Sequence, residues 1–337
     1  MLAVLILVGG LGAGGYYGYT WLSDVMTPDD YAGQGSGEVT VEIETGQTAT
    51  EVAQTLVEQD VVKSAKAFTN AVAAAGKSSS LQPGVYRLRK QMSAAAAVDL
   101  LDPGKQLMER VTLKEGLRLS DTITTLAKST GMAAAEFQKA ARDTEALGLP
   151  SYARGRLEGY LFPATYDITP KMSATDILTA MVDRFNETAE KEKLVAGAKA
   201  LGRTPHEIIT IASIVQAESG KADDMGKIAR VIYNRLEEGR KLEMDSTVFY
   251  GLKKYGIAAT NADLQSTSPY NTYRRTGLPP GPISNPGDQA IQAALNPPAG
   301  DWRWFVATDP ERGVTEFAST EADFLRLKAK FEKTRTG

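Results

Sequence analysis

The N-terminal segment most constrains what this chain can fold into, because residues 2–22 carry no charged side chain over 21 consecutive positions. As a helix with a rise of about 1.5 Å per residue, such a segment just spans the roughly 30 Å hydrocarbon core of a bilayer. Three tyrosines and Trp21 gather at its C-terminal end, where an aromatic belt meets the membrane interface. The segment therefore predicts a single transmembrane helix over residues 1–23.

The residues after this segment predict its orientation. Asp24, Asp29 and Asp30 follow it, and no Lys or Arg occurs before Lys63. Because positive charge marks the cytoplasmic side of a membrane, we expect an N-in, single-pass anchor in the cytoplasmic membrane, with the remaining chain outside the cytoplasm. A cleaved signal peptide is the alternative, although the basic start is missing and the apolar run is long for one.

Composition excludes several classes of site. The chain has 337 residues, enough for two or three domains. It has no cysteine and a single histidine, His206, which excludes thiolate zinc sites, a cysteine nucleophile and a multi-histidine metal site. We therefore expect no metal and no cofactor. The net charge of −3 argues against a nucleic-acid binder, which normally presents a basic face.

Residues 24–104 predict a linker and a small module. The segment 24–38 contains a Gly/Ser-rich run and predicts a linker. Residues 39–104 predict a small α+β module of two strands and three helices. The signals are alternating apolar residues at 39–43, a capping box that begins at Thr48, a helix around 65–75, a strand at 84–88, and a helix capped by Ser93.

The opening pattern of this module recurs about 70 residues later. Residues 111–116 repeat the alternation of residues 41–46 and end on glycine in the same place, and Leu126 falls where Leu56 does. The repeat predicts a second strand-helix-helix unit, and residues 105–155 join the module to the rest of a domain over 105–337.

The remaining sequence predicts a mixed α+β domain with a helical core. Helices are expected over residues 173–194, from Thr204, over 223–238 and from Glu321, with a hairpin formed by 302–307 and 315–318. Residues 245–298 are rich in Pro, Gly and Asn and are predicted to be largely irregular. Long irregular segments in compact domains are usually functional or disordered, and the aromatic residues here favour function.

Glu218 is the strongest candidate for chemistry. It ends an apolar stretch and, at about 100° per residue, projects between Ile211 and Ile214 within the apolar arc of a helix. Because burial disfavours the charged form, we expect a raised pKa and a proton retained near neutrality, as a general acid requires. The alternative is a glutamate that reaches solvent or pairs with Arg230 or Arg235.

A cluster of polar and aromatic residues predicts sugar binding. Tyr270, Asn271, Thr272 and Tyr273 offer two phenols, an amide and a hydroxyl, which suit the hydroxyl edges and apolar faces of a sugar. The following GLPPGPI segment predicts a rigid loop that preorganises such a site. Asn234 is expected to line the same groove. A plain structural turn is the alternative for this cluster.

These motifs together resemble the endolytic murein transglycosylases of the YceG-like family. The motifs that carry the resemblance are EGYLFP at 158–163, ASIV at 212–215 with Glu218, NRL at 234–236, Asp245 with Thr247-Val248 and Tyr250-Gly251, YNTY at 270–273, GLPPGPI at 277–283 and NPG at 285–287. The resemblance covers nearly the whole chain and implies a LysM-like module at 39–104. The sequence departs from the family's common forms at Gln216, where glutamate is frequent, at Ala164, where aspartate is frequent, and at Ser246, where proline is frequent.

The resemblance implies cleavage of peptidoglycan glycan strands between N-acetylmuramic acid and N-acetylglucosamine, without water. Glu218 matches the catalytic glutamate, which would act first as acid and then as base while the muramyl C6 hydroxyl attacks its own anomeric carbon to leave a 1,6-anhydro end. The substrate contacts expected from it are Tyr270, Asn271, Thr272 and Tyr273, supported by Asn234, Asp245 and Glu158. Glu158 is also the rival acid.

Two other functions stay open. A muramidase-type hydrolase would need Glu158 or Asp245 as a second carboxylate across the site, because glycosidases use two. A non-catalytic scaffold of the wall-synthesis machinery would bind peptidoglycan through residues 39–104 and cleave nothing. The resemblance also implies peptidoglycan synthases of the elongation machinery as partners.

Overall fold

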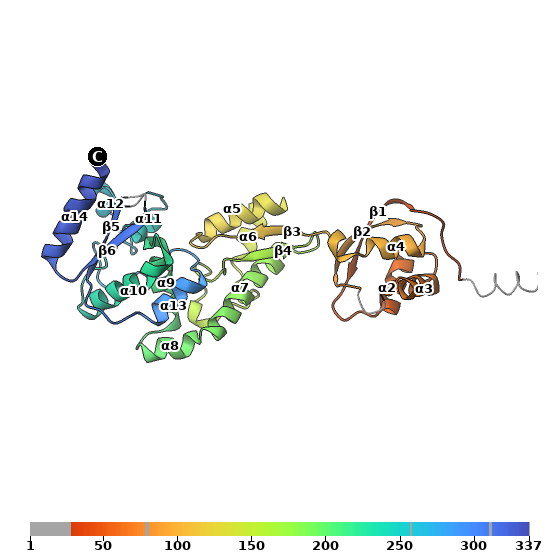
Figure 1. Ribbon diagram of the computed structural model, residues 1–337, viewed down its shortest axis with the longest axis horizontal. Coiled ribbons are helices and arrows are strands. Elements are labelled where there is room, and N and C mark those ends of the chain that lie inside the picture. Colours follow the sequence, from red (N-terminus) through yellow and green to blue (C-terminus); the bar gives the residue numbers. More distant parts are fainter. Residues whose placement is uncertain (1–27, 78–80, 257, 310–311, 337) are drawn as a thin grey trace, which may run out of the picture. The chain divides into compact units, whose positions relative to one another are not determined.

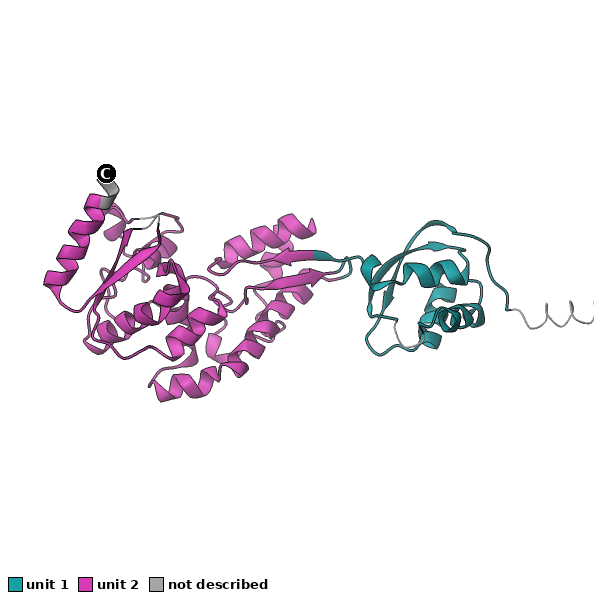
Figure 2. Cartoon of the chain, viewed as in Figure 1, with its two compact units in different colours: residues 1–109, 169–171 teal, residues 110–168, 172–337 magenta. Residues whose placement is uncertain are grey.

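The computed structural model describes residues 28–77, 81–256, 258–309 and 312–336 (Figure 1). The helix predicted over residues 1–23 lies outside these described residues, and among them no helix has the length and apolar character needed to cross a membrane. The described chain forms two compact units (Figure 2). Unit 1 contains residues 28–109 with 169–171, and unit 2 contains the remainder.

Unit 1 follows the order predicted from its sequence. Its elements are β1 (Ser36–Ile43), α2 (Ala49–Glu58), α3 (Ala65–Ala74), β2 (Gly84–Lys90), α4 (Ala94–Leu100) and the 3-10 turn η1 (Pro103–Lys105). The two strands pair antiparallel, with Val41 opposite Tyr86. Thr48 and Glu51 form the predicted capping box: the Thr48 hydroxyl accepts from the Glu51 N–H, and the Glu51 carboxylate accepts from the Thr48 N–H.

The residues just before β1 are hydrogen-bonded to unit 1. The Asp30 carboxylate accepts from the Ala94 N–H at 3.0 Å, and the Tyr31 hydroxyl donates to Asp60 at 3.0 Å. The Ser64 hydroxyl donates to the Asp29 carbonyl. This end of the segment predicted as a linker is therefore held against the unit.

Unit 2 begins with the element order that the internal repeat predicts. Its first elements are β3 (Glu109–Thr112, whose first residue belongs to unit 1), α5 (Leu119–Thr130), α6 (Ala134–Ala140) and β4 (Thr165–Ile168), and β3 and β4 form a two-stranded sheet. Leu126 and Phe137 are fully buried, as are their counterparts Leu56 and Phe68. The repeated apolar positions are thus the core positions of two similar strand-helix-helix-strand layers.

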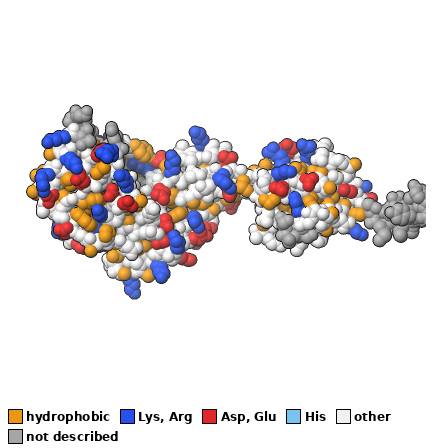
Figure 3. All heavy atoms as spheres, viewed as in Figure 1, with side chains coloured by type: hydrophobic (Ala, Val, Ile, Leu, Met, Phe, Trp, Pro, Cys, Tyr) orange, Lys and Arg blue, Asp and Glu red, His pale blue; other side chains and the backbone are white. Residues whose placement is uncertain are grey.

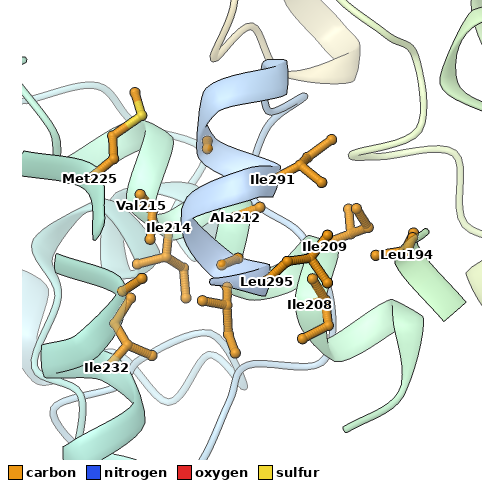
Figure 4. Packing of buried hydrophobic residues seen from close by; sticks show 14 of the residues in the cluster. Leu194, Ile208, Ile209, Ala212, Ile214, Val215, Met225, Ile232, Ile291 and Leu295 are labelled. Carbon is orange, nitrogen blue, oxygen red and sulfur yellow. The ribbon is translucent and has the colours of Figure 1, made fainter. Parts of the chain in front are cut away.

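A buried helix, α9, organises the rest of unit 2. The helices here are α7 (Ala174–Lys191), α8 (Leu194–Ala200), α9 (Pro205–Glu218), α10 (Ala222–Glu237) and α13 (Asp288–Leu295). α9 begins as predicted, with Thr204 as N-cap and Pro205 in the first turn. Residues 208–215 are all buried, so α9 is enclosed on every side rather than along one arc. Figure 4 shows its isoleucines packed against α13, α10 and α8.

The segment 245–298 is more ordered than predicted. It contains α11 (Asp245–Gly251), α12 (Asn261–Leu264) and α13, whereas the sequence predicted a largely irregular chain. Its Pro, Gly and Asn residues lie in the connections between these short helices. After it come the predicted hairpin, β5 (Trp304–Asp309) antiparallel to β6 (Val314–Ala318), and the predicted closing helix α14 (Glu321–Thr336). The fold is therefore mixed α+β, with a helical core in unit 2.

The charged side chains lie mainly at the surface. Acidic and basic groups are interspersed on the face of unit 2 shown in Figure 3. Ion pairs such as Arg110–Asp167, whose side chains are both more than half exposed, contribute at most about 1 kcal/mol each. The stability of unit 2 therefore rests on its apolar core, which includes α9 and α13.

Candidate active site

Glu218 is the last residue of α9 and is half-buried. The Ser246 hydroxyl donates to Glu218 Oε1 at 2.6 Å, and the Ser246 N–H approaches the same oxygen at 3.4 Å. Burial raises the pKa of the Glu218 carboxyl, the two Ser246 hydrogen bonds oppose that rise, and the charge of Asp245 adds to it. The side chain is thus oriented by Ser246 and inclined to keep its proton.

Pairing of Glu218 with an arginine, one alternative for this residue, is wrong. The Arg230 guanidinium donates to the carbonyls of Pro297 and Pro298. Arg235 is buried and donates to the carbonyls of Leu242 and Arg303, and it also pairs with the Glu243 carboxylate at 3.3 Å. Both arginines therefore serve loop structure, and Glu218 keeps its free oxygen.

Asp245 is the second carboxylate of this region and the first residue of α11. The Tyr273 hydroxyl donates to Asp245 Oδ1 at 2.7 Å, and the Ala259 N–H donates to Oδ2 at 2.8 Å. Burial raises the pKa of the Tyr273 phenol, and the neighbouring charges of Asp245 and Glu218 raise it further. Asp245 and Tyr273, both predicted as substrate contacts, therefore form a hydrogen-bonded pair, and Asp245 adjoins Ser246, which binds Glu218.

Glu158 lies in a cleft of about 720 Å³ together with Tyr250 and Tyr270. Its Oε1 accepts from the Leu119 N–H at 2.9 Å, and its Oε2 accepts from the Tyr250 hydroxyl at 3.1 Å. Burial raises the pKa of Glu158 to about 7, against the lowering effect of both hydrogen bonds and of the Arg118 charge. The rings of Tyr250 and Tyr270 lie 4.7 Å apart.

Residues of one helix, α11, form hydrogen bonds with both glutamates. Ser246 bonds Glu218 and Tyr250 bonds Glu158, and these two residues are four positions apart on α11. Residues at i and i+4 share a face of a helix and are separated by about 6 Å along its axis. The two residues of α11 that bond Glu218 and Glu158 are therefore about one helical turn apart.

The structure does not bring all the predicted contact residues to this surface. Asn271 is fully buried: its amide donates to the carbonyls of Leu264 and Ser266, and its Oδ1 accepts from the Tyr273 N–H. Thr272 is buried too, and its hydroxyl accepts from the Met244 N–H. Both side chains shape the loop and present no free polar atom.

Asn234 serves another loop. Its amide donates to the carbonyls of Gly300 at 3.1 Å and Trp302 at 2.8 Å. These bonds connect α10 to the chain that leads into β5. The direct contacts expected of Asn271 and Thr272 therefore need correction, because their polar atoms are already used within the protein. The NH₂ group of Asn234 is likewise occupied.

Asn285 explains how the separate motifs meet. It is 2% exposed, and its Oδ1 accepts from the N–H groups of Gly159 at 3.0 Å and Leu161 at 3.2 Å. Its backbone N–H donates to the Leu117 carbonyl. The NPG and EGYLFP motifs and the start of α5 are thereby fixed together around Glu158.

Gly159 allows that close approach. Its φ is +90°, and an added Cβ would lie 2.4 Å from the Cβ of Pro282 in the GLPPGPI segment. Only glycine adopts this backbone conformation at little cost and leaves room for the proline. The two motifs therefore pack directly on one another beside the cleft.

His206 has a structural place in unit 2. It is buried, its Nδ1 lies 2.8 Å from the Tyr160 hydroxyl, and its Nε2 lies 3.1 Å from the Pro280 carbonyl. The carbonyl can only accept, so Nε2 carries the proton and Nδ1 accepts from Tyr160. Burial lowers the pKa of His206, which favours this neutral form. Within the described parts of the chain, no group of three or more His, Asp or Glu side chains could hold a metal ion.

Sequence reasoning assigned no site role to Ser246, to Tyr250 or to Arg118. Tyr250 and Ser246 stood within the quoted motifs, and their spacing of four residues at a helix start was the available signal. Arg118 carries no such local signal, because the rings that it contacts, Tyr250 and Tyr255, come from α11 and the residues after it.

The fold and this site define an α+β protein with carboxylic acids set among tyrosine and serine hydroxyls, the arrangement of an acid–base enzyme. The chain belongs to the YceG-like family, whose model matches residues 41–330.

Named relatives and a solved structure agree with this membership. A Bacillus subtilis (strain 168) protein named endolytic murein transglycosylase is 33% identical over 87% of this chain and 84% of its own length. A protein of the same name from Streptococcus pneumoniae serotype 2 (strain D39) is 30% identical over 97% of this chain and 64% of its own. The crystal structure of a YceG-like protein from Listeria monocytogenes is 30% identical, covering 87% of this chain and all of that one, with a TM-score of 0.59.

Two departures from the family's common forms have structural roles here. Ser246 supplies the hydroxyl that binds Glu218, which a proline could not. The Gln216 side chain accepts from the Gly287 N–H at 3.0 Å and so holds the NPG loop to α9. The third, Ala164, contributes its carbonyl, which accepts from the Leu113 N–H. Glu218 is left as the carboxylate of this turn of α9.

Proposed function

We propose that this chain is an endolytic lytic transglycosylase that cleaves peptidoglycan between N-acetylmuramic acid and N-acetylglucosamine. The support is its family membership and its similarity to two proteins named endolytic murein transglycosylase. The observation that carries the proposal is Glu218, a half-buried acid whose pKa is raised by burial and whose position is fixed by Ser246. Such a group can donate a proton near neutral pH.

In the proposed reaction Glu218 acts twice. It first donates its proton to the glycosidic oxygen, and the bond between that oxygen and the muramyl anomeric carbon breaks. The muramyl C6 hydroxyl then attacks the anomeric carbon, and the Glu218 carboxylate accepts the hydroxyl proton. The products are a new N-acetylglucosamine hydroxyl and a 1,6-anhydromuramyl end. Because the nucleophile is already tethered, proximity replaces the second carboxylate that glycosidases need.

The hydroxyl groups around Glu218 have supporting parts in this proposal. Tyr273, held by Asp245, and Tyr270, whose ring packs at a tilt against that of Tyr250, present phenols and ring faces to the sugars. Asn271 and Thr272 keep the loop between them in shape. Glu158, which accepts from Tyr250 on α11, is assigned to the lining of the cleft rather than to the scissile bond.

The remaining parts of the chain extend the proposal. Residues 1–23 would anchor it in the cytoplasmic membrane with unit 2 outside, as their uncharged sequence predicts. The βααβ order of unit 1 supports a LysM-like module. Glycan strands are the proposed substrate, and peptidoglycan synthases of the elongation machinery are the proposed partners.

One observation favours a second candidate, a muramidase-type hydrolase. Asp245 is a carboxylate directly beside the residue that binds Glu218, and two carboxylates are what hydrolysis requires. Both oxygens of Asp245 already accept hydrogen bonds, from Tyr273 and Ala259, which leaves it poorly placed to activate water. The transglycosylase is therefore preferred.

A matched pair of variants tests the proposal. Purified glycan strands are incubated with the wild type, with Glu218→Gln and with Glu237→Gln, and the muramyl ends are separated by mass spectrometry. Glu237 is exposed near the end of α10, so its substitution makes the same chemical change away from the site. We expect anhydro ends from the wild type and Glu237→Gln and none from Glu218→Gln. Equal activity of Glu218→Gln would remove the assignment, and no cleavage by the wild type would favour the scaffold.

A further inference from the structure

The cleft beside Glu158 contains a basic group that the proposed chemistry does not use. Its side chains come from the start of α5, from α11 and from the residues that follow it. They include Arg118, Asp121, Tyr250, Lys253, Tyr255 and Tyr270. All belong to unit 2.

Arg118 is held in this cleft by aromatic rings. Its guanidinium carbon lies 4.2 Å from the centre of the Tyr255 ring and 5.5 Å from that of Tyr250. Arginine stacks on aromatic faces in this way while the edge of its planar fork stays available. The Arg118 guanidinium has no ion pair or hydrogen bond with any residue that the structure describes, so its N–H donors are free for a ligand.

The two acids of the cleft accept hydrogen bonds from other lining residues. The Tyr255 hydroxyl donates to the Asp121 carboxylate. Glu158 accepts from the Leu119 N–H and the Tyr250 hydroxyl, and with its pKa at about 7 it is only partly charged at neutrality. Lys253 adds a second, exposed positive charge to the lining. The two positive charges of Arg118 and Lys253 exceed the charge of Asp121 and the partial charge of Glu158, so the net charge of the lining is positive and suits an anionic group.

The cleft is placed to bind a part of the substrate that lies close to the scissile bond. Tyr250 lines it and lies one turn of α11 from Ser246, which binds Glu218. In the proposed substrate, the acidic groups nearest the bond are carboxylates on the lactyl side of muramic acid. They belong either to a stem peptide or, where the peptide is absent, to the lactyl group itself.

We propose that Arg118, stacked on Tyr255 and Tyr250, is a specificity-determining residue that binds a carboxylate on the lactyl side of the muramyl residue. The planar fork matches a carboxylate with two parallel N–H···O bonds, and the rings hold its plane fixed. The inference rests on the proposed function, because that function supplies the substrate. It goes further by assigning the recognition of the anionic side chain to a residue outside the family motifs quoted above.

Three substrates test the inference. Glycan strands are prepared with stem peptides, without stem peptides, and without stem peptides but with the lactyl carboxylate converted to a neutral amide. kcat/KM is measured for the wild type, Arg118→Gln, Arg118→Lys and Arg110→Gln. Arg110 is an exposed arginine on β3 that pairs with Asp167, so it controls for loss of one positive charge.

We expect Arg118→Gln to lower kcat/KM about tenfold on a carboxylate-bearing substrate, mainly through KM, because a charge-assisted bidentate contact is lost. Arg118→Lys should keep part of the effect, since it keeps the charge and loses the fork. Activity on the amide strands should be the same for all four proteins. A loss confined to stem-bearing strands identifies the stem peptide as the source, and a loss on the peptide-free strands identifies the lactyl group.

An equal loss on all three substrates, or no loss on any, would overturn the inference, with folding checked by thermal unfolding. Binding to Glu218→Gln gives a readout that does not need cleavage: soluble muramyl fragments should bind about tenfold more weakly to Glu218→Gln carrying Arg118→Gln. If the wild type cuts none of the strands, the proposed function fails, while this binding difference still decides the role of Arg118.

Discussion

Replacement of Glu158 by glutamine should stabilise the protein at alkaline pH. In the folded protein, Glu158 accepts from the Leu119 N–H and meets the Tyr250 hydroxyl. The glutamine oxygen can accept from Leu119, and its NH₂ can donate to the Tyr250 oxygen, since a hydroxyl both donates and accepts. The variant therefore keeps both contacts and removes the charge that burial disfavours.

The size of the effect follows from the pKa of Glu158. Burial raises it from 4.5 to about 7. At about 1.4 kcal/mol per pH unit, this difference would correspond to about 3 kcal/mol, and water that reaches the half-buried side chain reduces the expected value to about 1–2 kcal/mol. The unfolded chain releases the Glu158 proton at lower pH than the folded one. The wild type therefore loses stability as pH rises from about 4.5 to about 7, whereas the variant does not.

Urea unfolding of both proteins at a series of pH values measures this difference. Glu158→Gln should match the wild type most closely at the lowest pH and exceed it by about 1–2 kcal/mol at pH 8. Glu237→Gln, at an exposed position, is the control whose difference from the wild type should stay flat. A Glu158→Gln difference that is flat, or that grows towards acid pH, would refute the reasoning on burial at this site.

Three further substitutions test other contacts. Ser246→Ala removes a hydrogen bond that lowers the pKa of Glu218, so the alkaline limb of the pH–rate profile should move to higher pH; an unmoved limb would separate Ser246 from the acid. Gly159→Ala sets a Cβ 2.4 Å from Pro282 at a φ of +90° and should cost about 3 kcal/mol in urea unfolding, whereas an unchanged midpoint would contradict the close packing. Asn285→Ala leaves two buried N–H groups without their acceptor, so it should lower the free energy of unfolding by about 2–4 kcal/mol and lower activity. A near-neutral effect in urea unfolding, as expected for a surface asparagine, would contradict this role.

Local signals were enough to predict much of the fold. Helices begin at Thr48, Ser173 and Thr204 as the sequence predicts, and in the structure each of these residues caps its helix through a side-chain oxygen that accepts from an N–H three residues on. The internal repeat was visible because both layers bury apolar residues at matching positions. The short helices α11, α12 and α13 were missed, since helices of four to eight residues depend on packing more than on their own sequence.

The site was predictable only in part, because several of its contacts also depend on packing between distant segments. The raised pKa of Glu218 followed from its apolar neighbours in sequence. The roles of Asn271 and Asn234 could not be predicted in this way, because an asparagine that binds a sugar and one that holds a loop look the same in the sequence. The stacking of Arg118 on Tyr255 joins residues 137 positions apart, which only the folded chain reveals.

In the proposed reaction Glu218 alone, acting as acid and then as base, joins the muramyl C6 oxygen to its own anomeric carbon. Digestion of glycan strands in heavy-oxygen water, followed by mass spectrometry of the new muramyl ends, tests this most directly. We expect anhydro ends that contain no heavy oxygen and that disappear in Glu218→Gln. New ends that carry one heavy oxygen from the solvent would contradict it and identify a hydrolase.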